Sequence, residues 1–226
     1  MSHRVLITGA SGYLGGTLMA RLAASRADLP PFETLFASVR NDAQAESVRS
    51  LYGAEPLSVD FRDARAVRDA VVGHRITVVF YLIDAIGTDG QLHLIRALAE
   101  VKKATGLPVH FLHTTGAKLF SSHAGAPTDR PLLDTDPDLY DIQRAQKARF
   151  PLAQKGVEAN CKIIDAAEEL GVRSYIFAPC IVYGKNEGFG NPVSIQTVAI
   201  VRAAKAAGRV YRVDEGRPVR TIPSCP

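Results

Sequence analysis

Three glycines close to the start of the chain limit what it can fold into. Gly9, Gly12 and Gly15 follow the apolar run 5–7 and precede the amphipathic segment 14–27. A buried strand, a tight glycine turn and a helix, in that order, place free backbone N–H groups around a dinucleotide pyrophosphate. Glycine at these positions allows a sharp turn, a close approach of backbone to phosphate, and tight packing of helix on strand. The pattern predicts nucleotide binding; the alternative is an ordinary glycine-rich turn without a ligand.

The rest of the chain alternates apolar runs with amphipathic segments. The continuous apolar run 76–83 is typical of a central parallel strand that is buried on both faces. Segment 88–105 instead has apolar residues at helical spacing. The expected strands cover residues 4–8, 34–39, 55–59, 76–83, 108–115 and 172–178. This alternation predicts an α/β fold, a doubly wound parallel sheet of the Rossmann type.

Two segments depart from this rhythm. Residues 116–139 are polar and punctuated by prolines, which favours a long functional loop over the site. After Pro179, a glycine-rich loop, a helix at 194–207 and a short strand at 210–213 indicate a small substrate lobe.

We therefore expect a nucleotide-binding Rossmann domain at 1–180 and a partial substrate lobe with an irregular tail at 181–226. The lobe looks truncated. A truncated lobe would leave apolar surface exposed and favour poor solubility or pairing with another chain.

Composition and charge exclude several classes of partner. The net charge is +4, but no run of five or more Lys or Arg concentrates it, which argues against nucleic-acid binding. No apolar run comes close in length to the about 20 residues that a membrane-spanning helix needs. Cys161, Cys180 and Cys225 lack the spacing of metal ligands and favour a reducing compartment. The cysteine spacing therefore predicts no metal. Because the N-terminus also lacks the layout of a signal peptide, we predict a cytoplasmic protein. The expected partner is a small-molecule substrate, and a homodimer stays open.

Four stretches together are similar to a known family. They are the glycine motif 8–15, Val-Asp-Phe-Arg-Asp at 59–63, Phe-Leu-His-Thr-Thr at 111–115, and Ala-Pro-Cys-Ile-Val-Tyr-Gly at 178–184. With them the chain resembles the extended or atypical short-chain dehydrogenase/reductase family, the NAD(P)-dependent epimerase/dehydratase-like group. This resemblance implies a nicotinamide cofactor at the carboxyl ends of the strands. It also implies that Asp60 contacts the adenine, although an Asp after a strand can simply begin a turn. The expected cofactor-binding residues are Gly9, Ser11, Gly12, Tyr13, Leu14, Gly15, Arg40, Asp60, Phe61, Leu82, Thr114, Lys155 and Pro179.

The choice between the two nicotinamide cofactors depends on the end of the second strand. An acidic residue there would accept hydrogen bonds from a ribose 2′-hydroxyl and repel a 2′-phosphate. This chain has Arg40, whose guanidinium can grip a phosphate with two hydrogen bonds. We therefore predict NADP(H) in preference to NAD(H). The alternative is that Arg40 caps the sheet edge or stacks on the adenine.

The proton-transfer unit that the resemblance implies is incomplete. In the family it consists of a Ser or Thr, a Tyr, and a Lys four residues after that Tyr. Thr115 is the candidate hydroxyl, or a threonine placed there only for its strand propensity. Tyr140 is the nearest Tyr, but Arg144 stands four residues on, and Arg hardly titrates. Lys155 is the candidate to hold the nicotinamide ribose, or it faces solvent.

Two functions follow from this incomplete unit. The first is an NADP(H)-dependent oxidoreductase or epimerase/dehydratase-like enzyme that acts on a small organic or nucleotide-linked substrate. The second is a redox sensor that binds NADP(H) and regulates a partner without turnover. The missing in-frame Tyr-x-x-x-Lys favours the sensor, and the family-like segment after Pro179 favours the enzyme.

Overall fold

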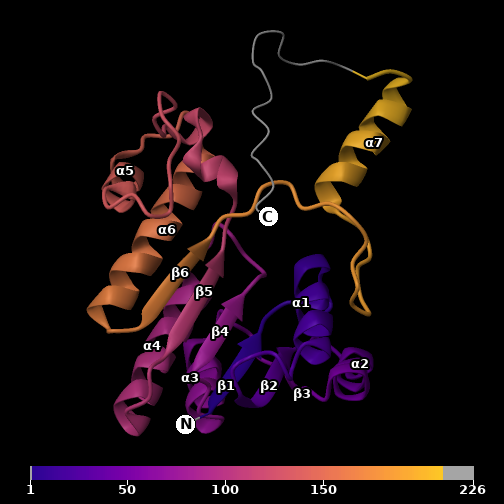
Figure 1. Cartoon of the computed structure of the whole chain (residues 1–226), viewed down its shortest axis with the longest axis vertical. Coiled ribbons are helices and arrows are strands. Elements are labelled where there is room, and N and C mark those ends of the chain that lie inside the picture. The colour runs from indigo at the N-terminus through magenta and orange to yellow at the C-terminus, as the bar shows by residue number, and fades with distance from the viewer. Residues whose placement is uncertain (1, 211–226) are drawn as a thin grey trace.

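Six parallel strands form one sheet at the centre of the computed structural model, which describes residues 2–210 (Figure 1). The strands are β1 (His3–Ile7), β2 (Phe32–Ser38), β3 (Glu55–Leu57), β4 (Val78–Tyr81), β5 (His110–Thr114) and β6 (Arg173–Phe177). Their order across the sheet is β3-β2-β1-β4-β5-β6, and every pair is parallel. Successive strands are added toward one edge of the sheet from β1 to β3 and toward the other edge from β4 to β6. Ligands of such sheets bind at the switch point between β1 and β4. The predicted doubly wound α/β fold is confirmed.

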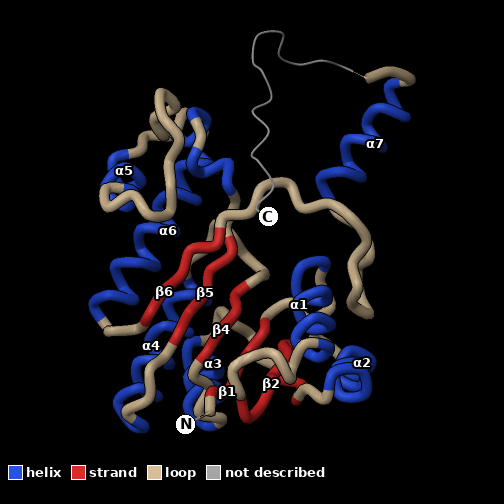
Figure 2. The backbone as a smooth tube through the Cα atoms, viewed as in Figure 1, coloured by secondary structure: helices blue, strands red, loops and turns tan. Residues whose placement is uncertain are grey.

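Helices cover the sheet from both sides (Figure 2). On one side lie α1 (Tyr13–Ala24) and α2 (Asp42–Tyr52), whose Met19 and Val48 are fully buried in one core cluster. On the other side lie α3 (Ala64–Gly73), α4 (Asp89–Thr105) and α6 (Pro151–Glu169), which share a second cluster. Neighbouring residues of β1 alternate between the clusters, since Leu6 joins the second and Ile7 the first. This double burial explains why the central strands read as continuous apolar runs.

The polar segment 116–139 differs from the loop expected over the site. It forms two short 3-10 helices, η1 (Ala117–Phe120) and η2 (Ser122–Ala124), and leads into helix α5 (Leu139–Ala145). All three pack against α6. The Gln146 side chain fixes this arrangement by donating hydrogen bonds to the carbonyls of Leu119 and Ala124, at 2.8 and 2.9 Å. Buried backbone carbonyls need such partners, so the segment folds onto a helix instead of reaching across the sheet end.

Beyond β6 the chain crosses the carboxyl end of the sheet, runs beside α1, and ends its described part in α7 (Ile195–Ala207). α7 points away from the sheet and buries none of its residues (Figure 1). Its apolar side chains Ile195 and Ile200 are 75% and 62% exposed. The predicted helix at 194–207 is present, whereas the strand expected at 210–213 falls outside the described residues apart from Val210. The domain boundary at residue 180 stays a prediction. None of the helices described in residues 2–210 could cross a membrane.

Candidate functional site

A cleft of about 1230 Å³ opens at the carboxyl ends of the strands. Its walls come from the turn after β1, the ends of β2 and β3, the segment after β4, and the residues that follow β5 and β6. Asn191, Ser194 and Gln196 close it from the side of α7. The cleft therefore spans the switch point between β1 and β4.

The glycine turn at the floor of the cleft has the geometry that only glycine allows. Gly9 has a φ of 67°, in the left-handed region, and its carbonyl accepts a hydrogen bond from the Gly12 N–H at 2.8 Å. A Cβ on Gly15 would lie 2.7 Å from the Gly9 carbonyl carbon, closer than real side chains approach. No side chain caps the N-terminus of α1. The N–H groups of its first turn, residues 13–15, have no carbonyl in their own helix, and uncapped N–H groups of this kind can bind an anion.

Hydrogen bonds between strand ends hold this turn in place. The Gly9 N–H donates to the Ser38 hydroxyl of β2 at 3.0 Å. The Thr8 hydroxyl accepts from the Leu82 N–H at 2.8 Å and is within 3.3 Å of the Phe80 carbonyl. Because these bonds link β2, β1 and β4 directly above the sheet, the first residues of the turn, Thr8 and Gly9, have little freedom to move.

The far end of the cleft carries two arginines and an ionised carboxylate. Arg40 follows β2, is exposed, and forms no ion pair within residues 2–210. The Arg62 side chain donates to both oxygens of Asp60, at 3.0 and 2.9 Å. Hydrogen bonds from the Arg62 side chain and backbone lower the pKa of Asp60 to about 2. Asp60 is therefore negative throughout the physiological range and still has free lone pairs for a ligand donor.

The family model that matches the sequence is the NAD dependent epimerase/dehydratase family, over residues 5–136. The chain belongs to this family. The matched part carries β1 to β5 and the whole glycine turn. No curated protein matches the chain.

Solved structures of this fold confirm the architecture. The UDP-glucose 4-epimerase of Thermotoga maritima with UDP-glucose has 15% sequence identity and a TM-score of 0.59, covering 94% of this chain and 66% of its own. The enzyme WbmG of Bordetella bronchiseptica in complex with NAD and UDP has 15% identity and a TM-score of 0.57, covering 92% and 61%. The UDP-glucose 4-epimerase of Thermus thermophilus in complex with NAD has 17% identity and a TM-score of 0.56, covering 91% and 63%. This chain thus spans less than two thirds of the length of each.

Most of the cofactor-binding residues expected from the sequence lie together in the structure. All except Thr114 and Lys155 line the cleft. Thr114 is buried behind it, and its hydroxyl has no hydrogen-bond partner within residues 2–210. Lys155 lies exposed on α6 and does not reach the cleft. The structure thus brings the expected phosphate and adenosine contacts to one surface but leaves Lys155 away from it.

The expected catalytic residues do not lie together: Thr115 lines the cleft, whereas Tyr140 and Lys155 lie outside it. Thr115 lines the cleft, is 7% exposed, and its hydroxyl has no partner among the described residues. Tyr140 lies on α5 outside the cleft, and its hydroxyl donates to Asp165 of α6. Burial, with a contribution from Asp165, raises the pKa of Tyr140 to about 12. A general acid–base with such a pKa works poorly near neutrality.

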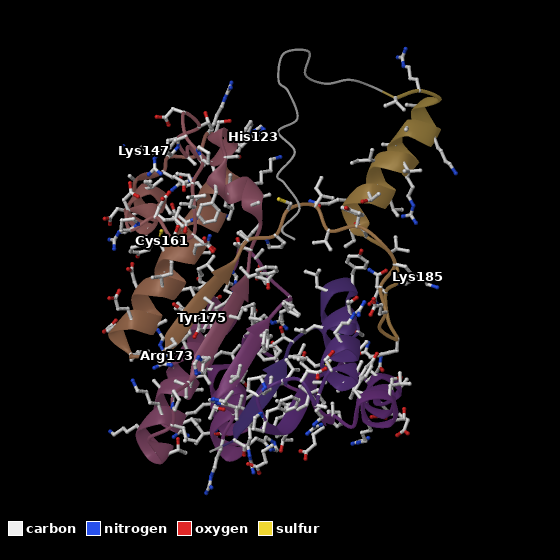
Figure 3. The ribbon with its side chains drawn as sticks, in the orientation of Figure 1. His123, Lys147, Cys161, Arg173, Tyr175 and Lys185 are labelled. Carbon is white, nitrogen blue, oxygen red and sulfur yellow. The ribbon has the colours of Figure 1, made fainter. Side chains whose placement is uncertain are left out.

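Tyr140 belongs to a second surface, away from the cleft. Its partners Arg144 and Asp165 border a separate hollow of about 240 Å³ together with Cys161. Cys161 and Lys185 are labelled on opposite sides of the molecule (Figure 3). The pair Tyr140–Arg144 thus has the spacing of a catalytic unit but belongs to a different surface.

Tyr81 and Asn191 are among the cleft-lining residues that sequence reasoning did not assign to the site. Tyr81 ends the central strand β4, and burial raises its pKa well above the ordinary value. Its position at the carboxyl end of a central strand was the available signal. Asn191 comes from a glycine-rich loop 180 positions after Ser11, so only the folded chain shows that it reaches the glycine turn.

Proposed function

We propose that the cleft binds NADP(H) and serves an oxidoreductase or epimerase/dehydratase-like reaction on a small organic or nucleotide-linked substrate. The observation that carries this proposal is one continuous cleft with a glycine-built anion site at its centre and Arg40 at its end. Ligand pockets usually measure about 300–1,000 Å³. The volume of about 1230 Å³ therefore leaves room for a substrate beside a dinucleotide.

Each part of the cofactor has a group to meet. The N–H groups of residues 13–15 would hold the pyrophosphate, supported by the positive end of the α1 dipole. Asp60 and Phe61 would border the adenine, and Arg40 would bind the 2′-phosphate. Pro179 and Thr115 line the opposite part of the cleft, on the side of the nicotinamide. Structures of the same fold hold NAD, UDP or UDP-glucose, which supports a nucleotide-linked substrate.

The bound nicotinamide would supply hydride transfer, and the chain would supply orientation and a hydrogen bond. The Thr115 hydroxyl is buried at the cleft wall without a partner in the described chain, so it can donate to a substrate oxygen. A nucleotide or small carbonyl substrate would enter beside Ser194 and Gln196.

One observation favours a sensor without turnover as the second candidate. The phenols that line the cleft in residues 2–210 are Tyr13, whose hydroxyl donates to the Gly184 carbonyl, and Tyr81, whose pKa is raised by burial. The Tyr81 phenol therefore lacks the lowered pKa that a catalytic phenol needs, and the Tyr13 hydroxyl is already hydrogen-bonded. A protein that binds NADP(H) and changes its contacts with a partner would not need one.

Calorimetry with NADP⁺, NAD⁺ and their reduced forms tests binding, and a panel of carbonyl compounds and UDP-sugars tests turnover. We expect NADP(H) to bind and to raise the melting temperature. Cofactor oxidation or an epimerised sugar product supports the enzyme, whereas binding without either supports the sensor. A folded sample that gives no heat and no rise in melting temperature with any pyridine nucleotide refutes both.

A further inference from the structure

Residues 184–193, here called the strap, run along α1 beside the glycine turn. The strap closes on itself through an antiparallel bridge between Lys185 and Val193. Its last part donates a hydrogen bond from the Asn191 N–H to the Ser11 carbonyl at 3.0 Å, and the Tyr13 hydroxyl donates to the Gly184 carbonyl at 3.0 Å. Figure 3 shows Lys185 on this loop beside α1. Both ends of the strap thus touch the segment that would hold the pyrophosphate.

The strap approaches α1 backbone to backbone. A Cβ on Gly188 would lie 2.5 Å from the Gly16 carbonyl carbon, and a Cβ on Gly190 would lie 2.7 Å from the Ser11 carbonyl carbon. Neither distance is accessible to a real side chain, so these positions accept only glycine without a shift of one backbone. Close packing of this kind transmits a displacement of the strap directly to the glycine turn.

One buried side chain of the strap makes hydrogen bonds both to the helix and within the strap. Asn186 is 5% exposed, and its Oδ1 accepts hydrogen bonds from the Thr17 hydroxyl and the Gly188 N–H, both at 2.7 Å. Its Nδ2 donates to the Asn191 carbonyl at 2.8 Å. A single amide thus links α1 to both arms of the strap, and its bonds are partly buried, where hydrogen bonds contribute more than they do in open water.

Further contacts join the strap to α1 and α2, among them the hydrogen bond from the Glu187 N–H to the Thr17 hydroxyl at 3.3 Å. The Phe189 ring lies 6.2 Å from the Tyr52 ring of α2, and the Phe189 N–H donates to the Tyr52 hydroxyl at 3.3 Å. Glu187 pairs with Arg21 of α1 on the surface. Exposed pairs of this type contribute little, about 0–1 kcal/mol. Asn186 is therefore the strap side chain whose removal should loosen the strap most.

We propose that Asn186 is a positioning residue that keeps the turn 9–16 in its phosphate-binding conformation through the strap. The inference rests on the proposed nucleotide binding and adds the residue on which the affinity for the pyrophosphate depends. The strap leads into Ser194 and Gln196 of the cleft wall, so the same contact couples the cofactor site to α7. If release of the strap left the turn competent about one tenth of the time, the apparent affinity would fall about tenfold.

The test compares two ligands on the full chain. NADP⁺ contacts the glycine turn through its pyrophosphate, whereas adenosine 2′-phosphate has no pyrophosphate and reaches only the Arg40 end. We expect Asn186→Ala to weaken NADP⁺ about tenfold and to leave adenosine 2′-phosphate unchanged. Glu187→Ala, in the same strap but at the exposed ion pair, should leave both affinities unchanged.

A second pair of variants changes Thr17, the α1 residue that contacts Asn186. Thr17→Val removes the hydroxyl that donates to Asn186, and Thr17→Ser retains it. We expect Thr17→Val to repeat the selective loss of NADP⁺ affinity and Thr17→Ser to behave as wild type. This pair decides the question if Asn186→Ala does not fold, as judged by circular dichroism and thermal melting.

The outcomes distinguish the proposed nucleotide binding from the role of Asn186. Failure of the wild type to bind NADP⁺ refutes the proposed function, and the role of Asn186 with it. Wild-type binding with unchanged NADP⁺ affinity in both Asn186→Ala and Thr17→Val refutes the role of Asn186 alone. An equal loss for both ligands also refutes it, since that result indicates general destabilisation of the domain.

Discussion

Replacing Arg40 with alanine should separate the two nicotinamide cofactors. Arg40 lines the cleft, is exposed, and has no ion pair within residues 2–210, so binding a 2′-phosphate breaks no ion pair seen there. Hydrogen bonds to a charged group contribute about 1.5–3 kcal/mol each. Exposure to water puts the guanidinium–phosphate contact toward the lower part of that range. With 1.4 kcal/mol per factor of ten, the expected loss of NADPH affinity is about ten- to a hundredfold.

The assay is a calorimetric titration of wild type and variant with NADPH and NADH. Arg40→Ala should change the NADH affinity by less than about twofold, because NADH lacks the 2′-phosphate. Arg65→Ala is the control: it removes the same charge from an exposed position of α3, paired there with Asp69, that does not line the cleft. Equal affinity of the wild type for NADPH and NADH would refute the reasoning. So would an equal loss in Arg40→Ala and Arg65→Ala, which would reduce the effect to the overall field of the protein.

Two further predictions concern the turn and the core. Gly15→Ala places a Cβ 2.7 Å from the Gly9 carbonyl carbon, so thermal melting should show a loss of about 1–3 kcal/mol and calorimetry a loss of NADP⁺ affinity. Gly73→Ala, where a Cβ meets open space, should be neutral or stabilising; an unaffected Gly15→Ala would contradict the close packing. Burial lowers the pKa of His113 to about 4, so its neutral form is favoured by folding. Below the unfolded pKa of about 6.5 the unfolded chain binds a proton that the folded chain does not, and the unfolding free energy should fall by about 3 kcal/mol between about pH 6.5 and pH 4. Urea denaturation across this range measures the slope, and His113→Phe should remove most of it; the same slope in that variant would place its origin elsewhere.

The sheet could be predicted because its physical causes are local. A strand buried on both faces must be apolar at every position, and β4 is recognisable for that reason. The predicted run 76–83 nevertheless exceeds the observed strand, Val78–Tyr81. Ile76 is fully buried, but its N–H donates to the Val71 carbonyl at the end of α3 and not to a neighbouring strand. Burial therefore marks the core, while only hydrogen bonding marks where the ladder begins.

Spacing alone could not predict where the candidate catalytic residues lie in the fold. Tyr140 and Arg144 are four residues apart, and on α5 they do lie on one face, with the Arg144 guanidinium 5.6 Å from the Tyr140 ring. Spacing fixes which side chains share a helix face, but not which surface of the protein that face meets. Here the face meets Asp165 of α6, 25 residues further along, because the segment before α5 folds onto α6.

The range of the constraint also explains why the glycine turn could be predicted from the sequence and the contacts of the strap could not. Gly9 and Gly15 are required by a backbone angle and by a clash within a few residues, so the sequence around them carries the whole signal. Gly188 is required by contact with Gly16, 172 positions earlier, and nothing near Gly188 in the sequence records that contact. An asparagine such as Asn186 is still less visible, because its amide could equally cap a turn in solvent. Residues that position a site through long-range packing therefore have to be found in the fold, and here they lie on the segment that joins the cleft to α7.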